Sequence, residues 1–207
     1  MAMTKSQIFT LIGTDLPDNT SGAITPARLR WVLTQIADAP VYAAAGVKEV
    51  EVLRAASTTT QAPSAVDTPL QLSFGGAQGS ASDPVMINAA GLVTFNQAGN
   101  YAVRVKLQCG RTGATGTSIL LSRLVLGGAQ LGSAACVKLT QTDATTPTDS
   151  RVVMNPTAGQ TFIVQIMRDS AGSNFGGVYP QTATVATWGV APSALLVISR
   201  LEPVPSP

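Results

Sequence analysis

VTFNQAGNYAVRVKLQC, residues 93–109, contains the clearest strand pattern of this 207-residue chain. Apolar side chains occupy every second position in its second half, namely Tyr101, Val103, Val105 and Leu107. Small, charged or amide side chains occupy the alternate positions, namely Ala102, Arg104, Lys106 and Gln108. Successive side chains of a strand point to opposite faces of a sheet. We therefore expect the first set in a hydrophobic core and the second set on an outward face.

Further short segments rich in β-branched residues flank this strand on both sides. The expected strands are Val50–Ser57, Leu70–Phe74, Leu92–Phe95, Tyr101–Cys109, Ser118–Leu126, Cys136–Thr140, Arg151–Met154, Thr161–Arg168 and Ala194–Leu201. The expected breaks between them are Gly75-Gly76, Asp83-Pro84, Gly110 to Gly116, Gly127-Gly128, Thr146-Pro147, Asn155-Pro156 and Gly176-Gly177. Short strands without intervening helices favour a mainly β fold, an antiparallel jelly-roll sandwich.

The N-terminal part of the chain has a helical pattern instead. Ser6 is a suitable cap for a short helix, and Thr25 followed by Pro26 predicts the start of a second one. The apolar side chains of the second helix recur at i, i+3, i+4 and i+7, namely Leu29, Val32, Leu33 and Ile36. So short a helix is not stable alone in water, so this stripe is expected to dock on a partner. We expect an attachment segment over residues 1–45 and a β domain over residues 46–207.

The composition argues for a protein that covers its surface with other proteins. Charged residues make up 12% of the chain, against roughly 25% in an ordinary soluble domain. Lys and Arg are scattered and the net charge is +2, so no nucleic-acid partner is expected. No run approaches roughly 18 uncharged apolar residues, so no membrane partner is expected either.

The residues of common catalytic and metal sites are missing from the sequence. The chain has no histidine, which removes the usual general base and imidazole zinc ligand. The N-terminus lacks a secretory signal, so Cys109 and Cys136 are expected to pack as small apolar side chains in a reducing cytoplasm. GRTGATG, residues 110–116, lacks the ending of a phosphate-binding loop and is interpreted as a hairpin. We expect no enzyme activity, no cofactor and no metal.

Two local patterns leave alternatives open. Asp169, with Ser173 and Asn174 nearby, has the oxygens of a cation site, although a turn stabilised by Asp and Gly is the favoured interpretation. Three aromatic residues lie in Gly-rich connecting sequence, namely Phe175, Tyr179 and Trp188. They are either a receptor or carbohydrate contact on a loop, or plugs for the end of the sandwich or for a subunit contact. The second interpretation is favoured.

The N-terminal pattern resembles a known kind of segment. The matching residues are Asp18, Asn19, Thr20, Gly22, Ile24, Thr25, Pro26, Leu29 and Arg30. They resemble a DNT-G-ITP-LR pattern that precedes a short helix near the N-termini of tailed-bacteriophage virion proteins, such as fibres and head fibres. The resemblance implies a virion protein assembled in the host cytoplasm, with other virion proteins as partners, above all the major capsid protein.

The β domain resembles the jelly roll of tumour necrosis factor and of complement heads. The matching residues are Phe95, Gly99, Tyr101, Gly159 and Phe162, while the closing strand, SALLVISR, lacks the aromatic residue and glycine frequent in that family. The resemblance implies a homotrimer. It also implies that the outward face of the 101–109 strand, with Ala102, Arg104 and Lys106, lies at or near the subunit boundary.

Together, the two resemblances imply a structural virion protein with a trimeric knob. It is expected to be a capsid decoration or head-fibre protein, because no fibrous shaft of repeats separates the two parts. The alternative is a short tail fibre or receptor-binding tip that contacts a host surface glycan.

Overall fold

The computed structural model describes residues 47–113, 116–142, 144–173, 175–185 and 187–203. Within this part of the chain, Glu49–Glu202 belong to one compact unit. The two expected helices lie outside the described residues, as do the four residues of the expected docking stripe, Leu29, Val32, Leu33 and Ile36. The attachment segment over residues 1–45 therefore stays a prediction.

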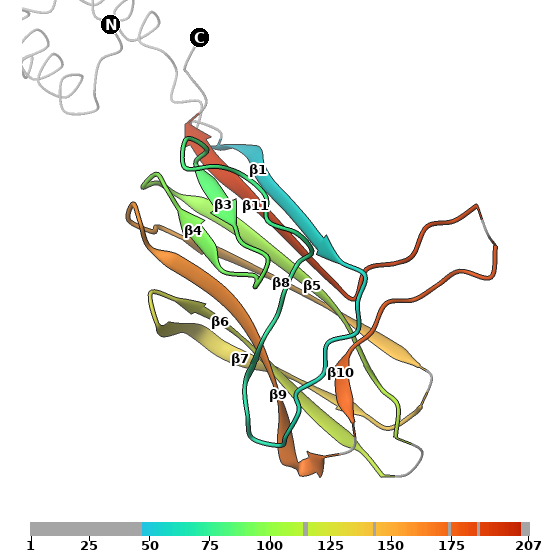
Figure 1. Cartoon of the computed structure of the whole chain (residues 1–207). Coiled ribbons are helices and arrows are strands. Elements are labelled where there is room, and N and C mark those ends of the chain that lie inside the picture. The colour runs from blue at the N-terminus through green and yellow to red at the C-terminus, as the bar shows by residue number, and fades with distance from the viewer. Residues whose placement is uncertain (1–46, 114–115, 143, 174, 186, 204–207) are drawn as a thin grey trace, which may run out of the picture. The chain divides into compact units, whose positions relative to one another are not determined.

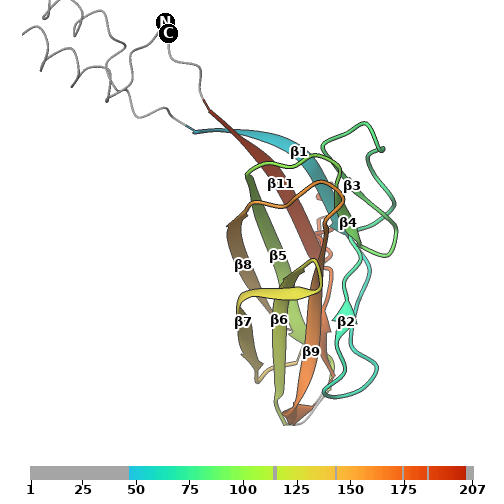
Figure 2. The ribbon, with the colours of Figure 1, turned by 90° about the vertical axis from the view of Figure 1, so that its left-hand side faces the viewer.

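In the described ranges, eleven strands form two antiparallel sheets (Figures 1 and 2). They are β1 (Val47–Ser57), β2 (Leu70–Gln71), β3 (Val85–Ile87), β4 (Val93–Phe95), β5 (Tyr101–Arg111), β6 (Ser118–Leu126), β7 (Ala129–Leu139), β8 (Thr145–Met154), β9 (Thr161–Ser173), β10 (Gly176–Val178) and β11 (Ala194–Pro203). The first sheet has the order β1-β11-β5-β10, with β8 on the other edge of β5. The second sheet has the order β3-β4-β9-β6-β7, with β2 also paired to β9. This all-β, two-sheet architecture was predicted and is consistent with a jelly roll.

One hydrophobic core lies between the two sheets, and the expected alternation in β5 builds one side of it. Tyr101, Val103, Val105 and Leu107 are all buried, as predicted. The Tyr101 ring lies 4.9 Å from the Phe95 ring, measured between centroids, in a tilted arrangement. Phe162 of β9 is also fully buried. The aromatic residues behind the family resemblance are thus core residues.

Two sequence breakers turn out to lie wholly inside strands, so these predicted breaks were wrong, and the break expected from Gly110 begins only after Arg111 of β5. Pro147 belongs to β8, which is an edge strand of the first sheet, and an edge tolerates a residue that cannot donate to the ladder. Gly176 and Gly177 belong to β10. A Cβ at Gly176 would lie 2.0 Å from Ser118 Oγ, and one at Gly177 would lie 2.7 Å from Gln61 O. Glycine is present here because of close packing and not because the chain turns.

Other strand boundaries also differ from the prediction. β3 was missed, and β7 begins at Ala129 instead of Cys136. The expected strand over residues 70–74 is a strand only at Leu70–Gln71, although Leu72 and Phe74 are buried. The side chains of β7 are mostly exposed, so the sequence of this strand lacks the apolar alternation that identifies β5.

The sandwich has two distinct ends. β11 runs from Ala194, beside Leu107, to Arg200, beside Tyr101, so its last residues lie where β5 begins. β1 starts at this same end (Figure 1), which we call the terminal end. At the opposite end, β5 reaches Arg111, which pairs with Gly176 of β10. We call this the far end, and the connections from β5 to β6, from β7 to β8 and from β9 to β10 lie there.

Candidate interaction surfaces

The outward face of β5 carries the residues predicted to lie near a subunit boundary. Arg104 and Lys106 are exposed, and Gln108 is half-buried. Ala102 lies on the same face but is only 4% exposed, because it sits between Ser199 of β11 and Val153 of β8. Its neighbour Val153 is exposed, at 56%, so Val153 and not Ala102 offers apolar surface on this face.

Charges on this face are paired within the chain. Arg104 Nε donates to Asp149 Oδ1 at 2.9 Å, and Arg104 Nη2 also contacts the same carboxylate. Lys106 Nζ lies 3.8 Å from Asp149 Oδ2. The hydrogen bond and charge of Arg104 hold the pKa of Asp149 below its usual value, and Asp149 raises the pKa of Arg104. Arg104 therefore has the acidic partner that a cation at a subunit boundary requires.

Two further ion pairs lie on the first sheet. Arg151 of β8 pairs with Glu49 of β1, and Arg54 Nη2 lies 2.8 Å from Glu51 Oε2 within β1. With the Asp149 group, four cations face three carboxylates. Such exposed pairs contribute little to stability. They do leave a polar face on which each of these cations has an acidic partner, with one positive charge in excess.

An open side of the sandwich lies between the edge strands β7 and β8. A cleft of about 190 Å³ enters there between the two sheets. Its apolar lining includes Val105, Leu107, Leu124, Leu131, Val152 and Val164. Two unpaired edges beside an accessible core are a site at which another chain can add. Sequence reasoning missed this surface, and the only signal for it was the run of small residues GSAAC at 132–136.

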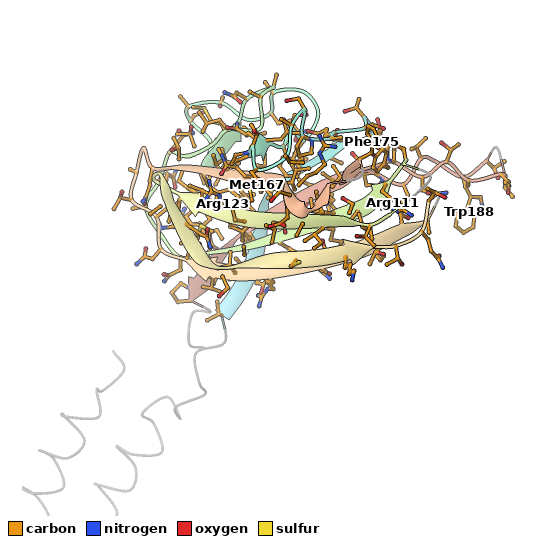
Figure 3. All side chains as sticks on the ribbon, turned by 90° about the horizontal axis from the view of Figure 1, so that it is seen from below. Arg111, Arg123, Met167, Phe175 and Trp188 are labelled. Carbon is orange, nitrogen blue, oxygen red and sulfur yellow. The ribbon has the colours of Figure 1, made fainter. Side chains whose placement is uncertain are left out.

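The three aromatic candidates do not form one cluster (Figure 3). Tyr179 is half-buried and its hydroxyl donates to Phe175 O at 2.8 Å, so these two residues meet at the far end. The Phe175 ring is 61% exposed, and its backbone has φ +48°. Trp188 is 74% exposed and lies on a separate projection (Figure 3). Within a single chain, Phe175 and Trp188 do not plug the end of the sandwich.

Arg111, a buried arginine, fills part of the far end of the sandwich. Arg111 is only 5% exposed at the end of β5. Its Nη1 donates to Gly113 O at 2.9 Å, and its Nη2 donates to Thr140 O at 2.6 Å. These bonds tie the β5–β6 connection to the chain after β7. An arginine usually lies on the surface, so nothing in the sequence marked this one as structural.

The two cysteines have different environments. Cys109 is buried, as predicted, and burial raises the pKa of its thiol to about 11, although a hydrogen bond with Thr148 acts in the opposite direction. Cys136 is exposed on the edge strand β7, so the expectation that it packs inside was wrong. Both thiols are free. The sequence could not separate the two residues, because it does not show which face of an edge strand is covered.

The described residues hold no cluster suited to a metal ion. Among them no three His, Cys, Asp or Glu side chains gather closely enough to bind one. Asp169 Oδ1 accepts a hydrogen bond from Ala171 N at 2.8 Å, but both residues lie within β9, so the turn that was favoured over a cation site is not present here. The same part of the chain contains no helix of the length and hydrophobicity needed to cross a membrane.

Comparison with known proteins gives a likeness in structure only. No protein-family model matches the chain, and no curated protein matches it in sequence. Crystal structures of murine APRIL, a jelly-roll protein of the tumour-necrosis-factor family, match at two pH values. At pH 5.0 the identity is 13% and the TM-score 0.45, and at pH 8.5 they are 13% and 0.44. Each match covers 74% of this chain and 100% of the other. A likeness at this level says nothing of what this chain binds.

Proposed function

We propose that this chain is a structural protein of a tailed-bacteriophage virion, a capsid decoration or head-fibre protein without chemistry of its own. Its β domain is a trimeric knob like that of tumour necrosis factor. Its N-terminal segment holds it on the shell, with the major capsid protein as the partner. The virion context is supported by the N-terminal sequence pattern from Asp18 to Arg30. The protein is made in the host cytoplasm and stays in the particle.

The open side between β7 and β8 is the main structural feature in favour of self-association. Partly buried apolar residues such as Leu124, Leu131 and Val152 line a cleft there that the single chain leaves accessible. A partner that covers this side removes the apolar lining from solvent, together with the edges of β7 and β8 that pair with no other strand. In the trimer, this side of one copy packs against the outward face of β5 in the next. Since Arg104 and Lys106 share Asp149 as an acidic partner, each of these cations keeps a partner when that face is covered, with one positive charge in excess.

The entry of the chain at the terminal end supports a knob whose far end points away from the shell. The chain enters the β domain near Glu49, at the terminal end. The far end, with Arg111 and Phe175, lies at the opposite end of the strands. A domain that is held through the residues before β1 presents its far end away from the shell.

Immunogold electron microscopy of purified particles, with an antibody against residues 50–201, tests this function. The expected result is label spread over the head in tens to hundreds of copies. Leu33→Asp should abolish incorporation, because it places a charge in the expected docking stripe, whereas Gln35→Ala, outside that stripe, should not. Particles without the chain would contradict the proposal.

A receptor-binding tip is the second candidate function. The exposed Phe175 ring at the far end favours it, because aromatic faces stack on sugar rings and this end faces outward. In that case only a few copies per particle are expected, at the tail. Phe175→Ala would then reduce adsorption to host cells and leave incorporation unchanged.

A further inference from the structure

The connection between β10 and β11 forms an arm that projects from the sandwich (Figures 1 and 3). The arm, residues 179–193, has the sequence YPQTATVATWGVAPS and contains no charged residue. Its two halves pair at the base, where Gln181 N donates to Ala191 O at 3.0 Å and Ala191 N donates to Gln181 O at 2.8 Å. Further out, Trp188 N donates to Val185 O at 3.0 Å. The arm is therefore a hydrogen-bonded hairpin.

The root of the arm is fixed to the sandwich. The buried Ser193 hydroxyl contacts Ser57 O at 3.0 Å and Thr59 O at 2.6 Å. The Ser193 backbone N–H also donates to Ser57 O, at 2.8 Å. Anchoring of this kind holds the projecting part in place without covering it.

The outer part of the arm exposes large apolar side chains. Val185, Trp188 and Val190 are all exposed, and Trp188 is the most exposed of the three. Tryptophan is enriched at the centres of protein interfaces, and contiguous exposed apolar surface marks contact sites. An anchored hairpin that presents such residues without any charge is suited to an apolar protein surface.

A groove of about 460 Å³ adjoins the root of the arm. Leu195 of β11 pairs with Lys106 of β5, which pairs with Asp149 of β8, so these three residues share the outward face of the first sheet. All three line the groove, together with Pro192 of the arm. The groove and the arm are thus continuous with the face proposed to contact another copy.

We infer that the arm clasps a second copy of this chain, which lies in the groove and buries Trp188. The inference rests on the proposed self-association and adds an intersubunit contact to it. A second copy is the occupant because the floor of the groove is the proposed subunit face, on which Lys106 and Arg104 already have an acidic partner in Asp149. A copy also brings its open β7–β8 side, whose lining includes Arg123 and Arg151 beside apolar residues such as Leu131. The apolar part of this lining suits the charge-free arm.

The test measures mass and tryptophan exposure on the same sample of the full chain. The chain has two tryptophans, so Trp31→Phe leaves Trp188 as the only indole. Light scattering reports the oligomer, and acrylamide quenching reports access to Trp188. We expect a trimer in which Trp188 is quenched several-fold less than after dissociation, either by dilution or by Arg104→Glu.

A substitution on the arm gives an independent measurement. Trp188→Ser should weaken association by about tenfold or more, as for a buried interface tryptophan. Thr184→Ala, at another exposed position of the arm, is the matched control and should leave association unchanged.

The outcomes separate the inference from the proposed function. A trimer with fully quenchable Trp188, or with unchanged association in Trp188→Ser, overturns the clasp and leaves the trimer standing. Equal protection in the trimer and the dissociated chain also overturns it, since the arm would then pack on its own domain. Protection that appears only with added host-surface glycan overturns it in favour of the receptor-binding candidate. A monomer removes the self-association itself, and the clasp with it.

Discussion

The sandwich and the arm place their side chains in opposite ways. In the sandwich, large apolar residues such as Tyr101 and Phe162 are fully buried, and exposed ion pairs such as Arg104–Asp149 lie on the first sheet. In the arm, no residue is charged and Trp188 points to solvent. The sandwich therefore buries most of its large apolar residues within one chain, except along the open β7–β8 side, whereas the arm leaves Val185, Trp188 and Val190 exposed. The difference indicates that the sandwich supplies stability and the arm supplies contact.

A substitution in the core should give the largest effect. Phe162→Ala removes a fully buried ring and should lower the free energy of unfolding by about 3–5 kcal/mol. Trp188→Ala removes a ring from the arm and should change it by less than about 0.5 kcal/mol. Both free energies of unfolding are measured with urea in the Arg104→Glu variant, because this variant is expected to be dissociated and association then contributes to neither value. Equal losses would show that the arm packs on its own domain.

The pH dependence of stability should come next in size. The pKa of Cys109 rises from 9.0 to about 11 on folding, so the folded state holds its proton more tightly than the unfolded state. The stabilisation is complete below pH 9 and is lost as the pH rises toward 11, by roughly 3 kcal/mol at most. Unfolding curves at pH 8 and pH 11 measure it. Cys109→Ala should remove this part of the loss, and an unchanged loss would assign it to other groups.

Gly176 in the sandwich and Gly189 in the arm allow the same substitution to be compared in the two regions. Gly176→Ala should cost about 1–3 kcal/mol, since its Cβ would lie 2.0 Å from Ser118 Oγ. Gly189 of the arm has no atom within 4 Å of the equivalent position, so Gly189→Ala should be nearly neutral. Thermal unfolding of the two variants measures the difference. A tolerated Gly176→Ala would mean that β10 moves easily, against the role given to close packing.

The smallest effect on stability is expected at the paired surface charges. Arg104→Glu places a carboxylate beside Asp149, and Arg54→Glu does the same beside Glu51. Both pairs are exposed, so neither change should shift the unfolding midpoint much. Only Arg104→Glu should reduce the oligomer, because Arg104 lies on the proposed subunit face. Light scattering and thermal melts on both variants make the comparison, and equal oligomer loss would remove Arg104 from that face.

The sequence predicted the part of the fold that follows from periodicity. The alternation from Tyr101 to Leu107 identified both the central strand and its buried side. Pro147 and Gly176 were taken as breaks, because the sequence cannot tell an edge strand or a close backbone approach from a turn. The edge strand β7 was predicted only from Cys136 onward, because its mostly exposed side chains lack apolar alternation. Cys136 was therefore wrongly placed in the interior.

The candidate surfaces depend on tertiary structure to a greater degree. Arg104 and Lys106 were correctly placed outward by alternation, but Ala102 is covered by its neighbours. The β7–β8 cleft forms only when two strands from different sheets come side by side. The arm could not be foreseen either, because exposure of Trp188 depends on how Ser193 anchors the connection.

The mass of the full chain in solution tests the central claim most directly. Light scattering at micromolar concentration should give three times 21.2 kDa, about 64 kDa. That mass should fall toward the single-chain value in Arg104→Glu. A stable species of 21.2 kDa for the unaltered chain would contradict the account, because the open β7–β8 side and the arm would then be left without a partner.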